Sequence, residues 1–177
     1  MKPILMIIAP DHFRDEELFE TRAEIEKSGF KTVLASTHKG ACIGTKGGQA
    51  IAELKIDDVN STDYESVVFV GGNGSKVYFK NETAHRIARE MHQQGKIVSA
   101  ICIGPVILAE AGLLKNKRAT VYESEINTIK SLGATYTGEP VTQDGQLITG
   151  NGPASSQLFG EKISKAVINT LEETNRS

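Results

Sequence analysis

The chain has little of what several large functional classes need. Tryptophan is absent, and aromatic residues make up 6% of the 177 residues, which argues against a surface that stacks sugars or nucleic-acid bases. Lysine and arginine total 20 against 22 aspartate and glutamate residues. No basic excess exists to neutralise a phosphate backbone, so nucleic acid is not an expected partner.

Long apolar runs are also missing. Residues 4–9 and 97–109 form the longest ones, and Gly104-Pro105 splits the second, so neither approaches the ~20 apolar residues of a membrane helix. The six apolar residues after Met1-Lys2 are too few for a signal peptide. We therefore expect a cytoplasmic protein with no membrane partner.

Cysteine is scarce. Cys42 and Cys102 are the two in the chain, a number that suits a reducing compartment and is too small for a disulfide framework. A structural zinc site needs more ligands than they supply. Neither a metal nor another cofactor is expected.

The chain reads as one α/β domain over residues 1–177. Hydrophobic residues make up 39% and charged residues 24%, as in ordinary globular proteins, and a short frayed tail is expected at 172–177. Non-alternating, Ile- and Val-rich segments predict strands buried on both faces, and the patterns between them predict helices. The strands are 4–9, 32–35, 67–70 and 97–101, and the helices are 15–28 and 83–94.

The remaining segments extend the same alternation. A glycine-rich hairpin or loop is expected at 40–54, and the later elements are a helix at 105–111, a fifth strand at 119–122, a helix at 125–131, a hairpin of 135–141 with 146–149, and a last helix at 154–171. Strand–helix alternation of this kind predicts a flavodoxin-like three-layer α/β/α sandwich with a mainly parallel sheet. Functional groups in such sheets gather at the carboxyl ends of the strands.

Cys102 carries the sharpest functional signal. It follows a predicted strand and precedes a helix, with Ala100 and Gly104 two residues to either side, the small residues that a nucleophile elbow demands. Pro105 suits the first helical position. The helix N-terminus would favour the thiolate. The alternative is a small core cysteine.

Other candidates lie near the same sheet edge. Gly71 and Gly72 end the third strand, followed by Asn73, and a glycine amide there could face an oxyanion formed at Cys102. Glu17 flanks the apolar stripe of the first helix, where a first-turn carboxylate that complements the helix N-terminus is the simpler interpretation. Of the four histidines, His12 alone is placed near the thiol, and His85 is expected on a solvated helix surface.

These residues together resemble the ThiJ/PfpI superfamily, the Parkinson-associated DJ-one-like family. The resemblance is carried by Ala100–Pro105, by Gly71-Gly72, by Asp15-Glu16-Glu17 and by residues 150–155. It implies that Glu17 is a protonated acid hydrogen-bonded to the cysteine sulfur, and that the amides of Gly72 and Ile103 form an oxyanion pocket. It also implies a homo-oligomer, a dimer or larger.

Two positions depart from the family pattern. Members named as proteases often carry histidine directly after the nucleophile, where this chain has Ile103, so a general base for peptide hydrolysis is missing. One branch has a histidine where Tyr122 aligns, and tyrosine is a poor base near neutral pH. Tyr122 can still donate a hydrogen bond.

Four functions stay open. The resemblance implies a glyoxalase- or deglycase-like enzyme acting on small reactive carbonyls or on modified protein side chains, with Cys102 as nucleophile and Glu17 as proton carrier. Oxidative-stress sensing through oxidation of Cys102 is the first alternative. An intracellular peptidase or amidase is the second, and a binding or scaffold role with an inert Cys102 is the third.

Overall fold

The computed structural model describes residues 1–176. Its centre is a seven-stranded sheet in the order β11-β12-β8-β7-β1-β3-β6, parallel except for the β11–β12 pair. The strands of this sheet are β1 (Ile4–Ile7), β3 (Thr32–Ser36), β6 (Leu54–Lys55), β7 (Ser66–Phe69), β8 (Ile97–Ile101), β11 (Val141–Asp144) and β12 (Leu147–Gly150). The flavodoxin-type α/β sandwich expected from the sequence is confirmed.

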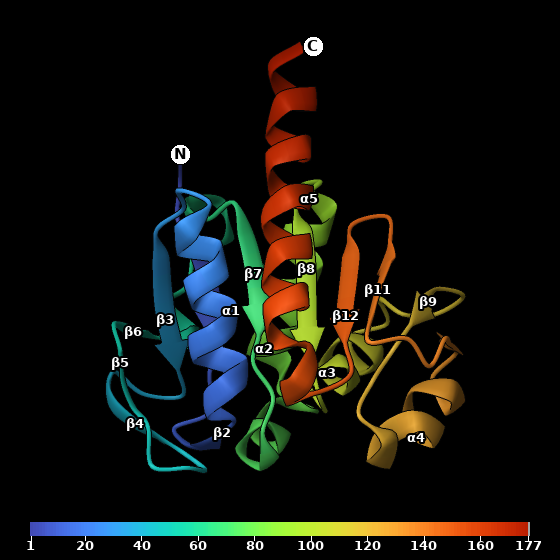
Figure 1. The fold of residues 1–177 in the computed structure, drawn as a ribbon, viewed down its shortest axis with the longest axis horizontal. Coiled ribbons are helices and arrows are strands. Elements are labelled where there is room, and N and C mark those ends of the chain that lie inside the picture. Colours follow the sequence, from blue (N-terminus) through green and yellow to red (C-terminus); the bar gives the residue numbers. More distant parts are fainter. Residues whose placement is uncertain (177) are drawn as a thin grey trace.

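Helices cover both faces of this sheet (Figure 1). The first face packs against α1 (Asp15–Lys27) and α5 (Ser156–Arg176), and the second against α2 (Glu82–Gln93), α3 (Pro105–Glu110) and α4 (Ile126–Ser131). Because side chains alternate along a strand, β1 sends Ile4 and Met6 into one core and Leu5 and Ile7 into the other. This double burial explains the unbroken apolar run.

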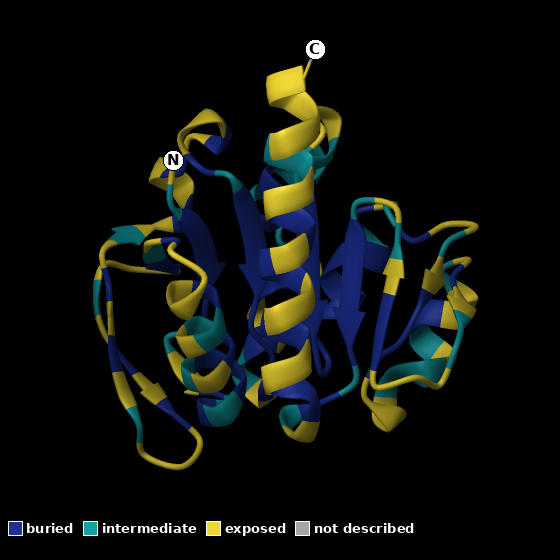
Figure 2. Ribbon diagram, turned by 45° about the horizontal axis from the view of Figure 1, so that its top comes forward, coloured by how far each residue is buried: buried dark blue, intermediate teal, exposed yellow. Residues whose placement is uncertain are grey.

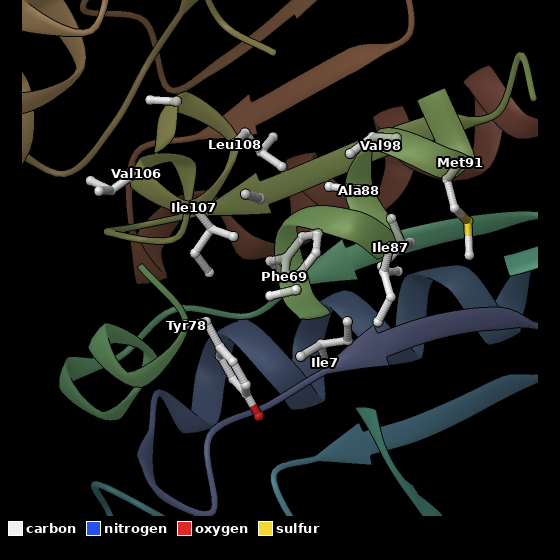
Figure 3. Packing of buried hydrophobic residues seen from close by; sticks show 14 of the residues in the cluster. Ile7, Phe69, Tyr78, Ile87, Ala88, Met91, Val98, Val106, Ile107 and Leu108 are labelled. Carbon is white, nitrogen blue, oxygen red and sulfur yellow. The ribbon is translucent and has the colours of Figure 1, made fainter. Parts of the chain in front are cut away.

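The second face has a tightly packed core. Figure 3 shows Ile7 and Phe69 from the sheet packed against Ile87 of α2, with Tyr78 beside them. The Tyr78 hydroxyl donates a 2.8 Å hydrogen bond to the carbonyl of Ile8. Burial raises the pKa of Tyr78, which suits a structural hydrogen-bond donor. On the other face of the sheet, the outer side of α5 is exposed to solvent while the strands beneath it are buried (Figure 2).

Two small sheets lie outside the main one. The first contains β2 (Asp11–Phe13), β4 (Gly40–Gly44) and β5 (Gln49–Ala52). The antiparallel pair β4–β5 is the hairpin predicted within 40–54. The second pairs β9 (Arg118–Ala119) with β10 (Thr135–Tyr136).

The expected fifth strand was misplaced. The segment predicted as 119–122 shrinks to β9 and leaves the main sheet, and β12 takes the position beside β8. Leu147 and Ile148 of β12 are almost fully buried, whereas Arg118 of β9 is exposed, so β12 is the strand that suits an inner position.

Two other boundaries were also wrong. The predicted strand 135–141 breaks because Gly138 has a φ of 74° and Pro140 has no amide hydrogen to donate. The last helix does not fray at 172 but continues to Arg176, with the Thr174 hydroxyl bonded to the carbonyl of Thr170 at 3.0 Å. Ser177, the last residue of the expected tail, lies outside the described residues.

Candidate active site

Cys102 occupies a sharp turn between β8 and α3. Its φ of 65° is unusual for a residue with a side chain and marks a conformation held by its surroundings. A Cβ on Gly104 would lie 2.9 Å from the carbonyl oxygen of Ile101 and 3.0 Å from that of Phe69, so glycine is needed there. The Cys102 amide donates to the carbonyl of Gly150 at 2.9 Å. The nucleophile-elbow geometry predicted from the sequence is present.

Glu17 and Cys102 converge on Gly71. A Cβ at Gly71 would lie 2.5 Å from Oε1 of Glu17 and 2.6 Å from Cβ of Cys102, so this glycine leaves just enough room for both side chains. Glu17 has no exposed surface. Glu17 does lie in the first turn of α1, as the simpler interpretation expected, but its complete burial beside Cys102 goes beyond that interpretation.

The Glu17 carboxyl group is buried, and neither of its oxygens has a hydrogen-bond partner of good geometry. Interactions with the Cys102 thiol, the Gly71 amide and the charge of Arg14 lower the pKa of Glu17, but burial outweighs them. Burial raises the pKa of Glu17 to about 8. The side chain is thus mainly protonated at neutral pH and can act as a proton donor.

The thiol is less acidic than the sequence suggested. Burial, the negative charge of an ionised Glu17 and the hydrogen bond with Glu17 together raise the pKa of Cys102 to about 12, although the amides of Gly72 and Ile103 act in the opposite direction. The helix N-terminus alone therefore does not produce a thiolate. Because Glu17 contributes its charge only after losing its own proton, the two groups titrate as a pair.

The two expected oxyanion donors face the sulfur. The amides of Gly72 and Ile103 interact with the Cys102 thiol in the direction that lowers its pKa. Gly72 has a φ of 99°, and a Cβ there would collide with the Arg14 amide nitrogen and the His12 carbonyl. Its glycine identity thus brings a backbone N–H directly against the reactive sulfur.

A cavity of about 340 Å³ opens above Cys102. Five predicted site residues contribute to its wall, namely Cys102, Gly72, Asn73, Ile103 and Tyr122. The Tyr122 amide also donates a 2.8 Å hydrogen bond to the carbonyl of Cys102, which fixes this residue beside the thiol. The remaining wall residues are Arg14, Thr45, Lys76, Ser124 and Pro153.

Of the histidine expectations, the one for His85 was wrong. His12 is not part of the cavity wall; its side chain is 61% exposed and lies 3.7 Å from Asp11. His85 is buried rather than solvated, and its Nε2 lies 2.8 Å from the carbonyl oxygen of Phe79. None of the four histidines lines the cavity, so no imidazole is placed there as a base.

Asp15 holds the β4–β5 hairpin against this site. Its carboxylate accepts hydrogen bonds from the amides of Lys46 at 2.8 Å and Gly48 at 2.7 Å. Burial alone would raise the pKa of Asp15, but these amides outweigh it and the pKa is lowered. The hairpin tip, with Thr45 on the cavity wall, is therefore tied to the start of α1.

Sequence reasoning missed the cations of the cavity. Arg14 precedes α1 and Lys76 lies in the short helical segment Asn73–Tyr78. The only sequence feature that could have pointed to Arg14 and Lys76 is their position, since both follow strands that end at the same sheet edge as Cys102. Single charges in loops carry no pattern that separates them from ordinary surface residues.

Residues 1–176 contain neither a candidate membrane span nor a candidate metal-binding cluster. No helix within 1–176 has the length and apolar character to cross a membrane. In that range, no group of three or more His, Cys, Asp or Glu side chains is arranged to hold a metal ion.

Comparison with known proteins identifies the family. The sequence model of the DJ-1/PfpI family matches residues 2–166 of this chain. An uncharacterized protein of Methanocaldococcus jannaschii is 46% identical over 93% of this chain and 82% of its own, and the deglycase PfpI of Pyrococcus furiosus is 30% identical over 84% and 90%. The crystal structure of a ThiJ/PfpI domain protein from Brachyspira murdochii superposes with a TM-score of 0.93 at 30% identity, covering 96% of this chain and 99% of the other. The chain belongs to the DJ-1/PfpI family.

Proposed function

We propose that this protein is a cysteine-dependent enzyme that acts on reactive carbonyl compounds, in the manner of a glyoxalase or deglycase. The observation that carries the proposal is the placement of the Cys102 sulfur between a protonated, buried Glu17 and the amides of Gly72 and Ile103. Relatives named as deglycases in Pyrococcus furiosus and Thermococcus kodakarensis are each 30% identical to it. Their names support the reaction class.

The pair of acids can hold its shared charge on sulfur. A carboxylate at Glu17 would be fully buried without a good hydrogen-bond partner. A thiolate at Cys102 instead accepts two amide hydrogen bonds and borders the cavity. Since buried charge is stabilised where it is hydrogen-bonded, the reactive form of the pair is the one with the negative charge on the sulfur and the proton on Glu17.

This arrangement supports addition to an aldehyde. The sulfur attacks the carbonyl carbon, a C–S bond forms, and the carbonyl electron pair moves to oxygen beside the amides of Gly72 and Ile103. Glu17 donates its proton to that oxygen and becomes a carboxylate. The product is a neutral hemithioacetal on Cys102.

Turnover then requires the carboxylate of Glu17 as a base. It takes the proton from the carbon that bears sulfur and leaves an enediolate. Glu17 returns that proton to the neighbouring carbon while the hydroxyl proton passes to the adjacent oxygen, which gives a 2-hydroxy thioester and restores the carboxylate. Water cleaves that thioester and releases a 2-hydroxy acid with the free thiol. Starting from methylglyoxal and water, the sum is lactic acid, with no external oxidant.

Methylglyoxal consumption and lactate formation test the proposal. We expect both in the wild-type protein, a loss of more than a hundredfold in Cys102→Ser, and a comparable loss in Glu17→Gln. Cys42→Ser is the matched control, because Cys42 is buried in the hairpin with its sulfur 3.7 Å from the carbonyl of Gly40. Equal consumption by all four proteins would exclude the reaction.

Protein-bound carbonyl adducts form a second substrate group within the same proposal. The early adduct of methylglyoxal with the thiol of N-acetylcysteine serves as a probe. Faster disappearance of that adduct than its spontaneous release of methylglyoxal, dependent on Cys102, would support direct action on modified side chains. A rate equal to the spontaneous one would restrict the activity to the free aldehyde.

One observation favours oxidative-stress protection as a second function. A sulfinate at Cys102 would have the proton of Glu17 and the amides of Gly72 and Ile103 as donors. Dilute peroxide should therefore add two oxygens at Cys102, as seen by intact mass, and none in Cys102→Ser. Oxygen addition at the buried Cys42 instead would contradict it.

Peptide hydrolysis has weaker support. Ile103 follows the nucleophile, and no histidine lines the cavity, so the base that activates a cysteine protease is missing. We further propose, from the family membership and the composition, a cytoplasmic homo-oligomer. Size measurement in solution tests that assembly.

A further inference from the structure

The cavity above Cys102 has a one-sided charge. Two of its wall residues, Arg14 and Lys76, are cationic, and no wall residue in the described chain carries a carboxylate. This contrasts with the protein as a whole, whose net charge is −2. The positive charge is therefore concentrated where substrate must enter.

Arg14 is held in place by one side of its guanidinium group. Its Nε donates to Oε2 of Glu16 at 2.9 Å, and Glu16 also pairs with Lys46 at 3.3 Å. Within residues 1–176 the two terminal nitrogens of Arg14 have no hydrogen-bond partner. A guanidinium fixed at Nε with its terminal donors free is arranged to bind a carboxylate or phosphate.

The charge of Arg14 also reaches the reacting groups. Electrostatic interactions connect it to Cys102 and Glu17. Lys76 is exposed in the short helical segment Asn73–Tyr78 after β7 and makes no ion pair in the described chain. The charge of Glu16 is matched by Lys46. One negative charge on the Cys102–Glu17 pair would then offset one of the two cations Arg14 and Lys76, and the other remains available to a ligand.

We propose that this cavity selects carbonyl compounds that also carry a carboxylate or phosphate, with Arg14 and Lys76 binding the anionic group while the carbonyl faces Cys102. This substrate class rests on the proposed function. A cavity of about 340 Å³ is at the small end of ligand sites, so small anionic metabolites fit it better than long chains.

Two alkylating reagents of nearly equal size test the charge preference without any turnover. Iodoacetate is anionic and iodoacetamide is neutral, and both form an S–C bond at Cys102 with loss of iodide. The ratio of their rate constants at one pH cancels changes in thiolate population. We expect the ratio of the iodoacetate rate constant to the iodoacetamide rate constant to be higher for Cys42→Ser, which retains Cys102 and the cavity, than for N-acetylcysteine. This ratio should fall as added salt screens the charges of the cavity.

Substitution assigns the preference to residues. Arg14→Gln and Lys76→Gln should each lower the ratio by about twofold to fivefold, and Arg14→Lys should retain most of it. Lys80→Gln is the matched control, because Lys80 is an exposed lysine near Lys76 that does not line the cavity. An unchanged ratio in both Arg14→Gln and Lys76→Gln overturns the anion preference.

The outcome is separable from the proposed reaction. Methylglyoxal turnover with a ratio insensitive to Arg14 and Lys76 would remove the anion preference and leave the enzyme activity standing. A ratio that responds to both residues without methylglyoxal turnover would establish the anion site and reject the carbonyl reaction.

Discussion

The amide of Arg14 donates a 3.0 Å hydrogen bond to the carbonyl of Gly71. This bond ties the start of α1, which carries Glu17, to the loop that lies against Cys102. The distance between the carboxyl and the thiol is thus set by backbone contacts and does not depend on flexible side chains alone. Such rigid positioning is what a proton transfer between fixed groups requires.

Glu17→Gln should change how stability depends on pH. The pKa of Glu17 is raised to about 8 in the folded protein, so the folded state binds its proton more tightly than the unfolded state does. Stability from this group is full below the unfolded pKa of about 4.3 and is lost as pH rises towards 8, at up to about 1.4 kcal/mol per pH unit. Urea unfolding at several pH values should show this slope in the wild type and a smaller one in Glu17→Gln. An equal slope in both proteins would show that Glu17 is not the group responsible.

Gly71→Ala should damage the site more than the fold. The added methyl group would overlap Oε1 of Glu17, the carbonyl of Ile101 and Cβ of Cys102, and relieving such overlap costs about 1–3 kcal/mol. We expect the rate of Cys102 alkylation and its pH profile to change together. Gly145→Ala is the control, because its added Cβ meets nothing within 4 Å, and its positive φ costs stability without reaching the thiol. Identical alkylation profiles for wild type and Gly71→Ala would contradict the close packing.

Asp15→Ala should loosen the β4–β5 hairpin. Its loss leaves the amides of Lys46 and Gly48 without their acceptor, at a cost of about 1–3 kcal/mol. The lowered pKa of Asp15 means that the wild type has this stabilisation above the unfolded pKa and loses it as pH falls through the folded value. Amide hydrogen exchange at Lys46 and Gly48 measures the effect directly. Glu20→Ala, an exposed change on the same helix, should leave both amides protected.

Tyr122→Phe should lower turnover without altering the thiol. The Tyr122 side chain is 39% exposed at the cavity wall, and its backbone bond to Cys102 is independent of the hydroxyl group. If that hydroxyl donates to bound substrate, kcat/KM falls by roughly threefold to tenfold, the effect of one hydrogen bond. Iodoacetamide reactivity against pH should be the same in both proteins. Unchanged kcat/KM would assign Tyr122 a packing role only.

The family and the elbow could be predicted from local patterns because both depend on short-range sterics. Ala100 and Gly104 around Cys102, with Pro105 at the helix start, specify a tight strand-to-helix turn in the sequence itself. The strands buried on both faces could be predicted equally well, since a strand whose apolar residues do not alternate with polar ones has no exposed face. The position of β12 beside β8 could not be predicted in this way, because which strand occupies an inner position of a sheet depends on interactions between segments far apart in the sequence.

The chemical properties of the site, unlike the elbow, depend on contacts between distant segments. The sequence by itself determined that a lone thiol would follow a buried strand near Gly71 and Gly72. Only the tertiary structure decided that Glu17 would be fully buried against that thiol, that burial would raise both pKa values, and that Arg14 and Lys76 would share its cavity while His12 would not. Desolvation and Coulomb interactions depend on distances across the fold, and residue order does not encode those distances directly.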